Sequence, residues 1–182
     1  MRRRLHNLVG EAKRAMEDRN LRMLFATNFT RTFGMSVINP IMPLFIRSLG
    51  ADKLGVSMVL SASSAASIFL LVPCGLLADR YGRKKTIVAS TILSLLPPFF
   101  FAVSTSWQQI IPWAILFSVS ITMYFPAKDS IIADYTTPKN RAMFYGAINL
   151  ALCMASIVGP AAGGFIADRY GWASSFYLII LT

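Results

Sequence analysis

The sequence predicts an all-α integral membrane protein, folded as a bundle of bilayer-spanning helices. Of its 182 residues, 55% are hydrophobic and only 14% are charged. A soluble domain usually carries about 25% charged residues. The mean hydropathy is +0.55, and the apolar residues form long runs separated by short polar links. These observations favour membrane helices over a water-soluble core.

The positions of the basic residues exclude a nucleic-acid partner, although the formal net charge is +10. Most bases lie before the first apolar run or in short connections, as in membrane proteins that keep positive charge on the cytoplasmic side. Cys74 and Cys153 both lie inside apolar runs, and His6 is the only histidine. We therefore expect neither a disulfide framework nor a metal site, and no cofactor.

Residues 1–20 combine bases with apolar residues at helical spacing, which predicts a cytoplasmic basic segment. It either lies on an anionic membrane surface as an amphipathic helix or forms a solvated tail, and the sequence leaves both open. Five runs that follow are long enough to span a bilayer of about 30 Å. They cover residues 21–46, 54–77, 86–104, 110–132 and 142–167.

A sixth run, residues 172–182, would reach only about 17 Å as a helix. It is too short to cross a bilayer. We interpret it as a truncated sixth helix, and we expect a C-terminal half of the molecule as a partner of this chain.

An internal repeat organises the chain. The segment Gly75-Leu-Leu-Ala-Asp79-Arg80-Tyr81-Gly82 returns 89 residues later as Gly164-Phe-Ile-Ala-Asp-Arg-Tyr-Gly171, with six of eight positions identical. The copies close the second and fifth runs, which cross the membrane in opposite directions. The repeat therefore predicts two three-helix units of inverted topology, residues 21–104 and 105–182.

The charge distribution predicts that the N-terminus is cytoplasmic. With that orientation thirteen bases lie inside, and only Arg47, Lys53 and Arg169 lie outside. The first motif copy continues with Arg83-Lys84-Lys85, whereas the second continues with Trp172-Ala-Ser. Loss of the bases from the outer copy follows from the resistance of positive charge to translocation.

The segment from Gly75 to Lys85 resembles the signature between helices two and three of the major facilitator superfamily. Gly159-Pro160-Ala-Ala-Gly163-Gly164 resembles the fifth-helix motif of the drug/proton antiporters in that superfamily. The segment from Phe125 to Arg141 resembles the end of the family's fourth helix. The resemblance covers about residues 21–182 and implies the N-terminal six-helix half of a secondary transporter.

The loop signature implies a gate between conformations. Asp79 and Arg83 lie four residues apart and can meet across a helical turn, and Asp134 is a further partner for either Arg83 or Arg80. Gly75 would permit close helix approach and Gly82 a tight turn. Lys84 completes this gating loop. The alternative is that the charges only fix topology and helix ends.

Glycines in the fifth helix predict a hinge. The candidate hinge residues are Gly146, Gly159, Pro160, Gly163 and Gly164. The alternative is plain packing of small residues beside a proline kink.

Arg31 is the only charge deep inside the runs. Such charges usually face the bundle interior and mark a substrate path. We expect Asn28, Arg31, Asn39 and Asn149 to line a central cavity suited to anionic or zwitterionic substrates. The alternative is a structural arginine that binds carbonyls or reaches the cytoplasmic surface. Lys128 and Asp129 are expected at the interface as a mutual pair.

The sequence thus predicts a multi-pass protein of the plasma or inner membrane, surrounded by lipids, that moves a small solute by alternating access. Efflux of a drug or metabolite coupled to protons is implied by the resemblance alone, because residues 110–123 of the fourth run carry no charge. A half-size transporter that dimerises and a non-transporting receptor or scaffold are the alternatives. No motif indicates an enzyme.

Overall fold

The computed structural model describes residues 19–138 and 141–181, and every regular element in these residues is a helix. The predicted segment 1–20 thus falls almost wholly outside the described part of the chain. The helices are α2 (Arg19–Ser48), α3 (Lys53–Tyr81), α4 (Arg83–Val103), α5 (Trp107–Tyr135), α6 (Arg141–Tyr170) and α7 (Trp172–Leu181). This all-α architecture is the predicted one.

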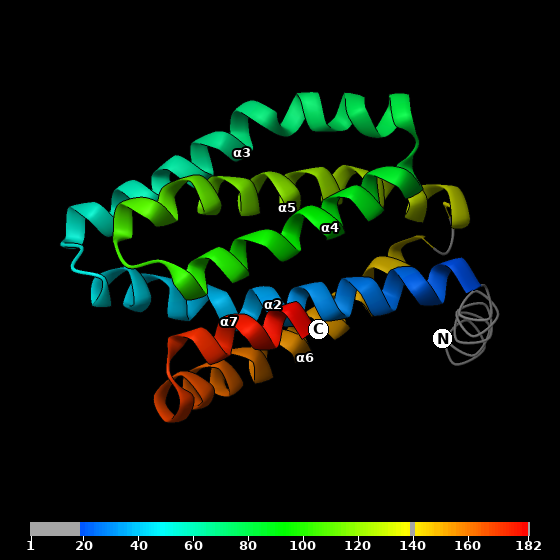
Figure 1. The fold of residues 1–182 in the computed structure, drawn as a ribbon. Helices are drawn as coiled ribbons and strands as arrows, with labels where there is room; N and C mark the ends of the chain where they lie inside the picture. Colours follow the sequence, from blue (N-terminus) through cyan, green and yellow to red (C-terminus); the bar gives the residue numbers. More distant parts are fainter. Residues whose placement is uncertain (1–18, 139–140, 182) are drawn as a thin grey trace.

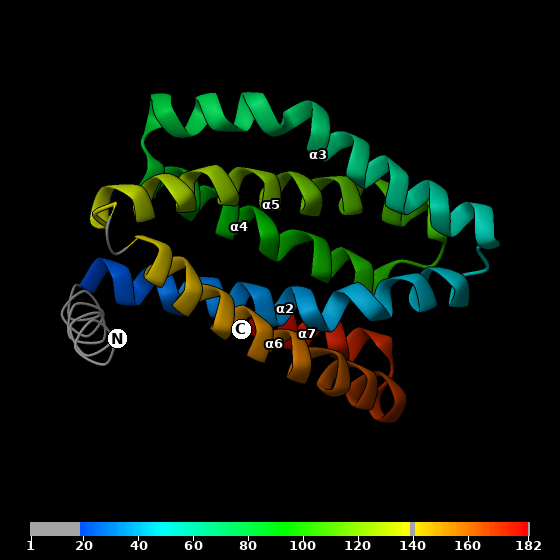
Figure 2. The same ribbon diagram turned by 180° about the vertical axis from the view of Figure 1, so that it is seen from behind.

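The helices run side by side along one common direction (Figures 1 and 2). Within the described residues, α3, α4 and α5 are long and apolar enough to cross a membrane. Many large apolar side chains point outward, and on α3 Ile68 is 73% exposed and Phe69 80%. Such a surface would be unfavourable in water and is the expected surface of a helix in lipid.

The two copies of the repeated motif form the same corner between helices. Gly82 ends α3 with φ +94° and Gly171 ends α6 with φ +82°, a left-handed region that other residues enter only with strain. The amide of Gly82 donates to the carbonyl of Ala78 at 3.1 Å, and that of Gly171 donates to Ala167 at 3.0 Å. The tight turn predicted at Gly82 is therefore present twice.

The helix contacts follow an internal two-fold exchange. α2 packs mainly along α6, and α3 packs along α5, while α4 meets α7 across the centre. Exchanging α2–α4 with α5–α7 leaves these three pairings unchanged, which is the arrangement expected of an inverted repeat. α4 also packs extensively along α5, whereas the equivalent contact of the short α7 with α2 is smaller. The predicted division after residue 104 falls in the link between α4 and α5.

A pair of serines lies in each of the two long interfaces. The hydroxyls of Ser36 on α2 and Ser156 on α6 lie 3.4 Å apart, and those of Ser118 on α5 and Ser67 on α3 are hydrogen bonded. Ser67 and Ser156 are 89 residues apart, the same offset as the two motif copies. Polar contacts of this kind help to hold membrane helices together.

The apolar core lies where α2, α4 and α7 meet. Val37, Ile41 and Phe45 on α2 are buried there with Phe101 of α4 and Phe176 of α7. The rings of Phe45 and Phe176 pack edge to face at 4.9 Å, a favourable arrangement for aromatic pairs. The ten-residue α7 is therefore an integral part of the bundle.

Two of the predicted hinge glycines let α6 approach the backbone of α2. A Cβ at Gly159 would clash with Ser36 and lie 3.0 Å from its carbonyl carbon, and one at Gly163 would lie 2.8 Å from Ile41 Cδ1. Gly146 and Gly164 have no other described atom within 4 Å of such a Cβ. α6 continues without a break through Pro160. The contact is thus one of close packing, and a hinge role stays a prediction.

Replacement of Gly159 by alanine is expected to lower stability by roughly 1–3 kcal/mol, because the added methyl group overpacks the contact with α2. Gly164→Ala is the matched control on the same helix and should leave stability unchanged or slightly raised, since alanine favours helix. Thermal unfolding of the purified variants in detergent measures both. Equal effects of the two substitutions would contradict the close contact.

Candidate functional site

Arg31 projects from α2 toward α5, where two side chains contact it. Its Nη2 donates to Ser120 Oγ at 3.4 Å, and its guanidinium lies over the ring of Tyr124, 4.6 Å from the centroid. The hydroxyl of Tyr124 donates to Asn28 Oδ1 at 3.3 Å. Asn28 and Tyr124 are both buried. The arginine is thus held by neutral groups on a partner helix.

One nitrogen of this guanidinium is left without a hydrogen-bond partner in the described part of the chain. Nη1 of Arg31 is enclosed, and neither ion pair found among the described residues includes Arg31. A buried charge without a counter-ion is costly, and a ring face and one hydroxyl offset only part of that cost. The group would therefore gain from an additional acceptor.

A cavity of about 240 Å³ opens beside this cluster between α2, α5 and α6. It brings together three of the four predicted cavity residues, Asn28, Arg31 and Asn39. Asn149 is exposed on α6 and is not among the lining residues. The remaining wall consists of Thr32, Met35, Ser36, Tyr124, Phe125, Leu152 and Ser156.

Two further cavities adjoin this one along α2. A cavity of about 340 Å³ lies on the other side of Arg31, against Thr91 and Ser94 of α4. A cavity of about 350 Å³ lies between α2, α3 and α5, and Asn39 lines it as well. Arg31 and Asn39 are therefore polar residues shared between neighbouring cavities, as are the apolar residues Met35 and Phe117.

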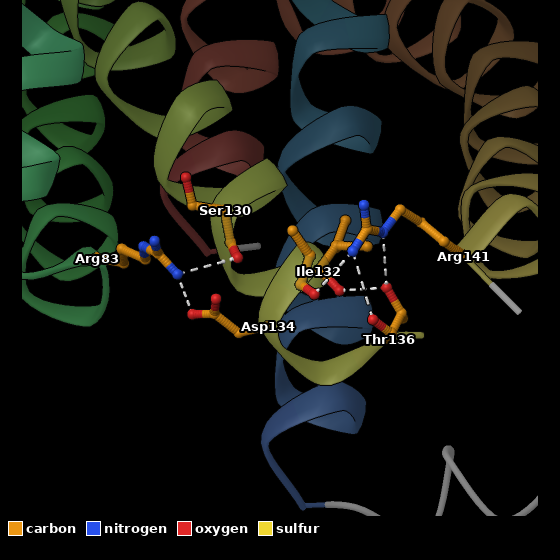
Figure 3. Close-up of polar contacts among 7 residues, drawn as sticks. Arg83, Ser130, Ile132, Asp134, Thr136 and Arg141 are labelled. Carbon is orange, nitrogen blue, oxygen red and sulfur yellow. Dashed lines mark hydrogen bonds and ion pairs between the residues drawn. The ribbon is translucent and has the colours of Figure 1, made fainter. Parts of the chain in front are cut away.

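At one end of the bundle Arg83 binds the end of α5. It forms an ion pair with Asp134, and its Nη1 donates to the carbonyl of Ser130 at 3.3 Å (Figure 3). Asp79 contributes electrostatic attraction to Arg83, but in the described residues the ion pair is with Asp134. Of the two carboxylates that the sequence offered to Arg83, Asp134 is therefore the one that pairs with it, and the helix-turn pairing with Asp79 is not the contact observed.

The other gating-loop residues make different contacts. Arg80 lies over the ring of Tyr81, 5.8 Å from its centroid. A Cβ at Gly75 would meet no other described atom within 4 Å, so the predicted close helix approach at Gly75 is not present here. Lys84 has an interaction partner in the structure.

Arg141 holds the same end of α5 from the opposite side. From the first turn of α6 it donates to the carbonyl of Ala133 at 3.1 Å and to Thr136 Oγ1 at 3.3 Å. Thr136 in turn donates to the carbonyl of Ile132 at 2.6 Å (Figure 3). The end of α5 is therefore bracketed by one arginine from each three-helix unit, and Arg141 satisfies the carbonyl of Ala133, which the helix end leaves unpaired.

Lys128 differs from the sequence expectation. Its side chain is only 8% exposed and is not an interfacial group, although it does pair with Asp129 at 3.4 Å as expected. Its Nζ also lies 4.9 Å from the centroid of the Phe125 ring. Tyr145 of α6 donates to the same carboxylate at 3.4 Å. The position of Lys128 near a helix end suggested an interfacial side chain. Its burial depends on side chains that only the tertiary packing brings over it.

The family model of the Major Facilitator Superfamily matches residues 24–182, nearly the whole chain. The chain belongs to the Major Facilitator Superfamily. It is therefore a multi-pass membrane protein of a transporter family and not an enzyme.

Several relatives within this superfamily are similar to the chain. An MFS-type transporter of Methanocaldococcus jannaschii is 29% identical over 170 residues, 88% of this chain and 42% of the relative. Multidrug resistance protein 2 of Bacillus subtilis is 30% identical over 80% of this chain and 36% of its own length. Quinolone resistance protein NorA of Staphylococcus aureus is 24% identical over 83% of this chain and 39% of its own length.

The chain spans about two fifths of the length of these superfamily members.

The residues that sequence reasoning missed at the site are Ser120 and Tyr124, because they lie about 90 residues from the α2 residues that they contact. Arg141 appeared only within a motif resemblance. A tyrosine within an apolar run indicates that its hydroxyl needs a hydrogen-bond partner, but the position of Tyr124 in the sequence does not identify that partner.

Proposed function

We propose that this superfamily member carries a small solute across the membrane by alternating access, together with a C-terminal half that completes the bundle. One observation carries the proposal: a cavity with an arginine and two asparagines in its wall lies inside a bundle whose outer surface is apolar. Intramembrane charges are costly and usually mark a substrate or ion path. The internal two-fold exchange supports the same mechanism, because rocking of repeats around a central site is the common transport cycle.

The direction and the coupling belong to the same proposal. Relatives named for multidrug and quinolone resistance support efflux of a drug or metabolite. Proton coupling would use a carboxylate that the cycle can protonate, and Asp129 and Asp134 on α5 are the candidates in the described residues of that helix. Asp129 touches both the buried Lys128 and Tyr145, so its protonation would change contacts between α5 and α6.

The ion pair between Arg83 and Asp134 is proposed as a latch for one conformation. It ties the first turn of α4, in one unit, to the last turn of α5, in the other. Exposed pairs of this kind add little to overall stability. A contact that differs between two conformations can nevertheless shift their populations.

The proposed orientation places the N-terminus and this latch in the cytoplasm. The start of α2, the α3–α4 corner, the end of α5 and the start of α6 lie at one end of the bundle (Figure 1). The basic residues Arg80, Arg83, Lys84, Lys85 and Arg141 are at that end. Positive charge favours the cytoplasmic side.

Reconstituted in liposomes, the natural gene product should export solutes from a panel that includes a quinolone, and an imposed proton gradient should accelerate the flux. Arg31→Ala should lower the flux by at least about tenfold, the value of a charged hydrogen-bonding group at a binding site. Arg22→Ala, an exposed arginine on the same helix, is the matched control. Absence of flux for every solute would favour a receptor or scaffold.

Asp134→Asn should shift the protein away from the latched conformation and alter the transport rate without a comparable loss of thermal stability. Exchange of the two charges, Arg83→Asp combined with Asp134→Arg, should restore part of the rate because it restores the attraction. Flux assays on the single and double variants decide the point. A double variant that transports no faster than either single variant would contradict the proposed latch.

Single cysteines at Lys84 and Trp172 should label from opposite sides of the membrane. Lys84→Cys should react with an impermeant maleimide only after the cytoplasmic side is opened, and Trp172→Cys should react in intact cells. Labelling of both from one side would contradict the inverted repeat and the proposed orientation.

A further inference from the structure

Two of these three cavities occupy corresponding positions under the internal two-fold exchange. The 240 Å³ cavity is lined by Asn28 and Ser156, and the 350 Å³ cavity is lined by Phe117 and Ser67, the residues that stand at the repeat offset of 89 from them. Leu152 in the first occupies the position of Ser63 in the second, at the repeat offset of 89 residues. The backbone exchange has thus produced two chambers of the same origin.

The chambers lie end to end along α2 and α5. The first is lined on α2 by residues from Asn28 to Asn39, and the second by Ile38, Asn39 and Met42. Asn39 lines both. From Arg31 to Met42 a helix rises about 16 Å, which is within the length of one elongated small molecule.

Their chemistry differs in a way that symmetry does not require. The first, the polar chamber, presents Asn28, Arg31, Thr32 and Tyr124. The second, the apolar chamber, has serines and Asn39 on its wall, but the rest of its lining is apolar, including Met42, Val59, Phe101 and Ile121, and no charged residue lines it. A molecule with an apolar body and one charged end matches this difference between the chambers.

Arg31 determines the charge of that end. Its enclosed Nη1 has no hydrogen-bond partner in the described part of the chain, and the groups that hold it, Ser120 and Tyr124, are neutral. No carboxylate lines the polar chamber. A guanidinium binds a planar carboxylate more strongly than it binds a neutral acceptor.

We propose that the substrates are amphipathic organic anions, with the acidic group at Arg31 in the polar chamber and an aromatic or aliphatic body in the apolar chamber. This inference rests on the proposed transport function and names its substrate class. Asn39, at the junction, would hydrogen bond to the linking part of the molecule.

Three probes with one apolar body test the inference: 1-pyrenebutyrate, 1-pyrenebutanol and 1-pyrenebutylamine. Equilibrium dialysis against the natural gene product in nanodiscs, with empty nanodiscs subtracted, measures their affinities. The carboxylate should bind at least about tenfold more tightly than the alcohol, as expected for a charge-assisted hydrogen bond, and the ammonium should bind most weakly. Equal or tighter binding of the alcohol or ammonium by the wild-type protein would overturn the inference.

Variants separate the two chambers. Arg31→Gln should reduce carboxylate affinity to that of the alcohol, and Ile121→Asn should weaken all three probes by a similar factor. Arg22→Gln removes an equal charge from the same helix and should change none of them. If Arg31→Gln does not fold, the wild-type ratios still decide. A protein that transports other solutes but shows no preference for the carboxylate would refute this inference and leave the proposed function intact.

Discussion

The close contact between α2 and α6 is the constraint on which the rest of the structure depends. In lipid the hydrophobic effect does not drive helices together, so they associate through close packing and polar contacts. Gly159 and Gly163 bring the backbone of α6 against Ser36 and Val37 of α2. The equivalent pairing of α3 with α5 is joined instead by hydrogen bonds of Ser118 with Ser63 and Ser67. These two interfaces leave α2 and α5 facing each other, and Arg31 and Asn28 on α2 contact Ser120 and Tyr124 on α5 there.

The polar cluster around Arg31 follows from that central position. A buried arginine needs partners, and α5 supplies a hydroxyl and an aromatic face without a counter-charge. Such an arrangement is a poor solution for stability alone, since a carboxylate or an apolar residue would serve better. It is a reasonable one for a site that receives an acceptor from outside the chain.

The two units share a backbone plan but differ in charge. The corners at Gly82 and Gly171 have the same turn, yet only the first is followed by a run of three bases, and only its arginine reaches the neighbouring unit. The end of α5 is therefore held by Arg83 and Arg141 at one end of the bundle.

The sequence by itself determined the helical membrane class, the helix boundaries to within a few residues, the inverted repeat and the turn at Gly82. These follow from local properties: hydropathy, glycine conformation and a repeated motif. It also named Asn28, Arg31 and Asn39 as neighbours, because they share a helix. The tertiary structure alone decided that Tyr124 and Ser120 hold Arg31, which of the two carboxylates named from the sequence, Asp79 or Asp134, pairs with Arg83, and that Lys128 is buried while Asn149 is exposed. Those outcomes depend on the angle and depth at which distant helices pack, and no local pattern in the chain encodes them.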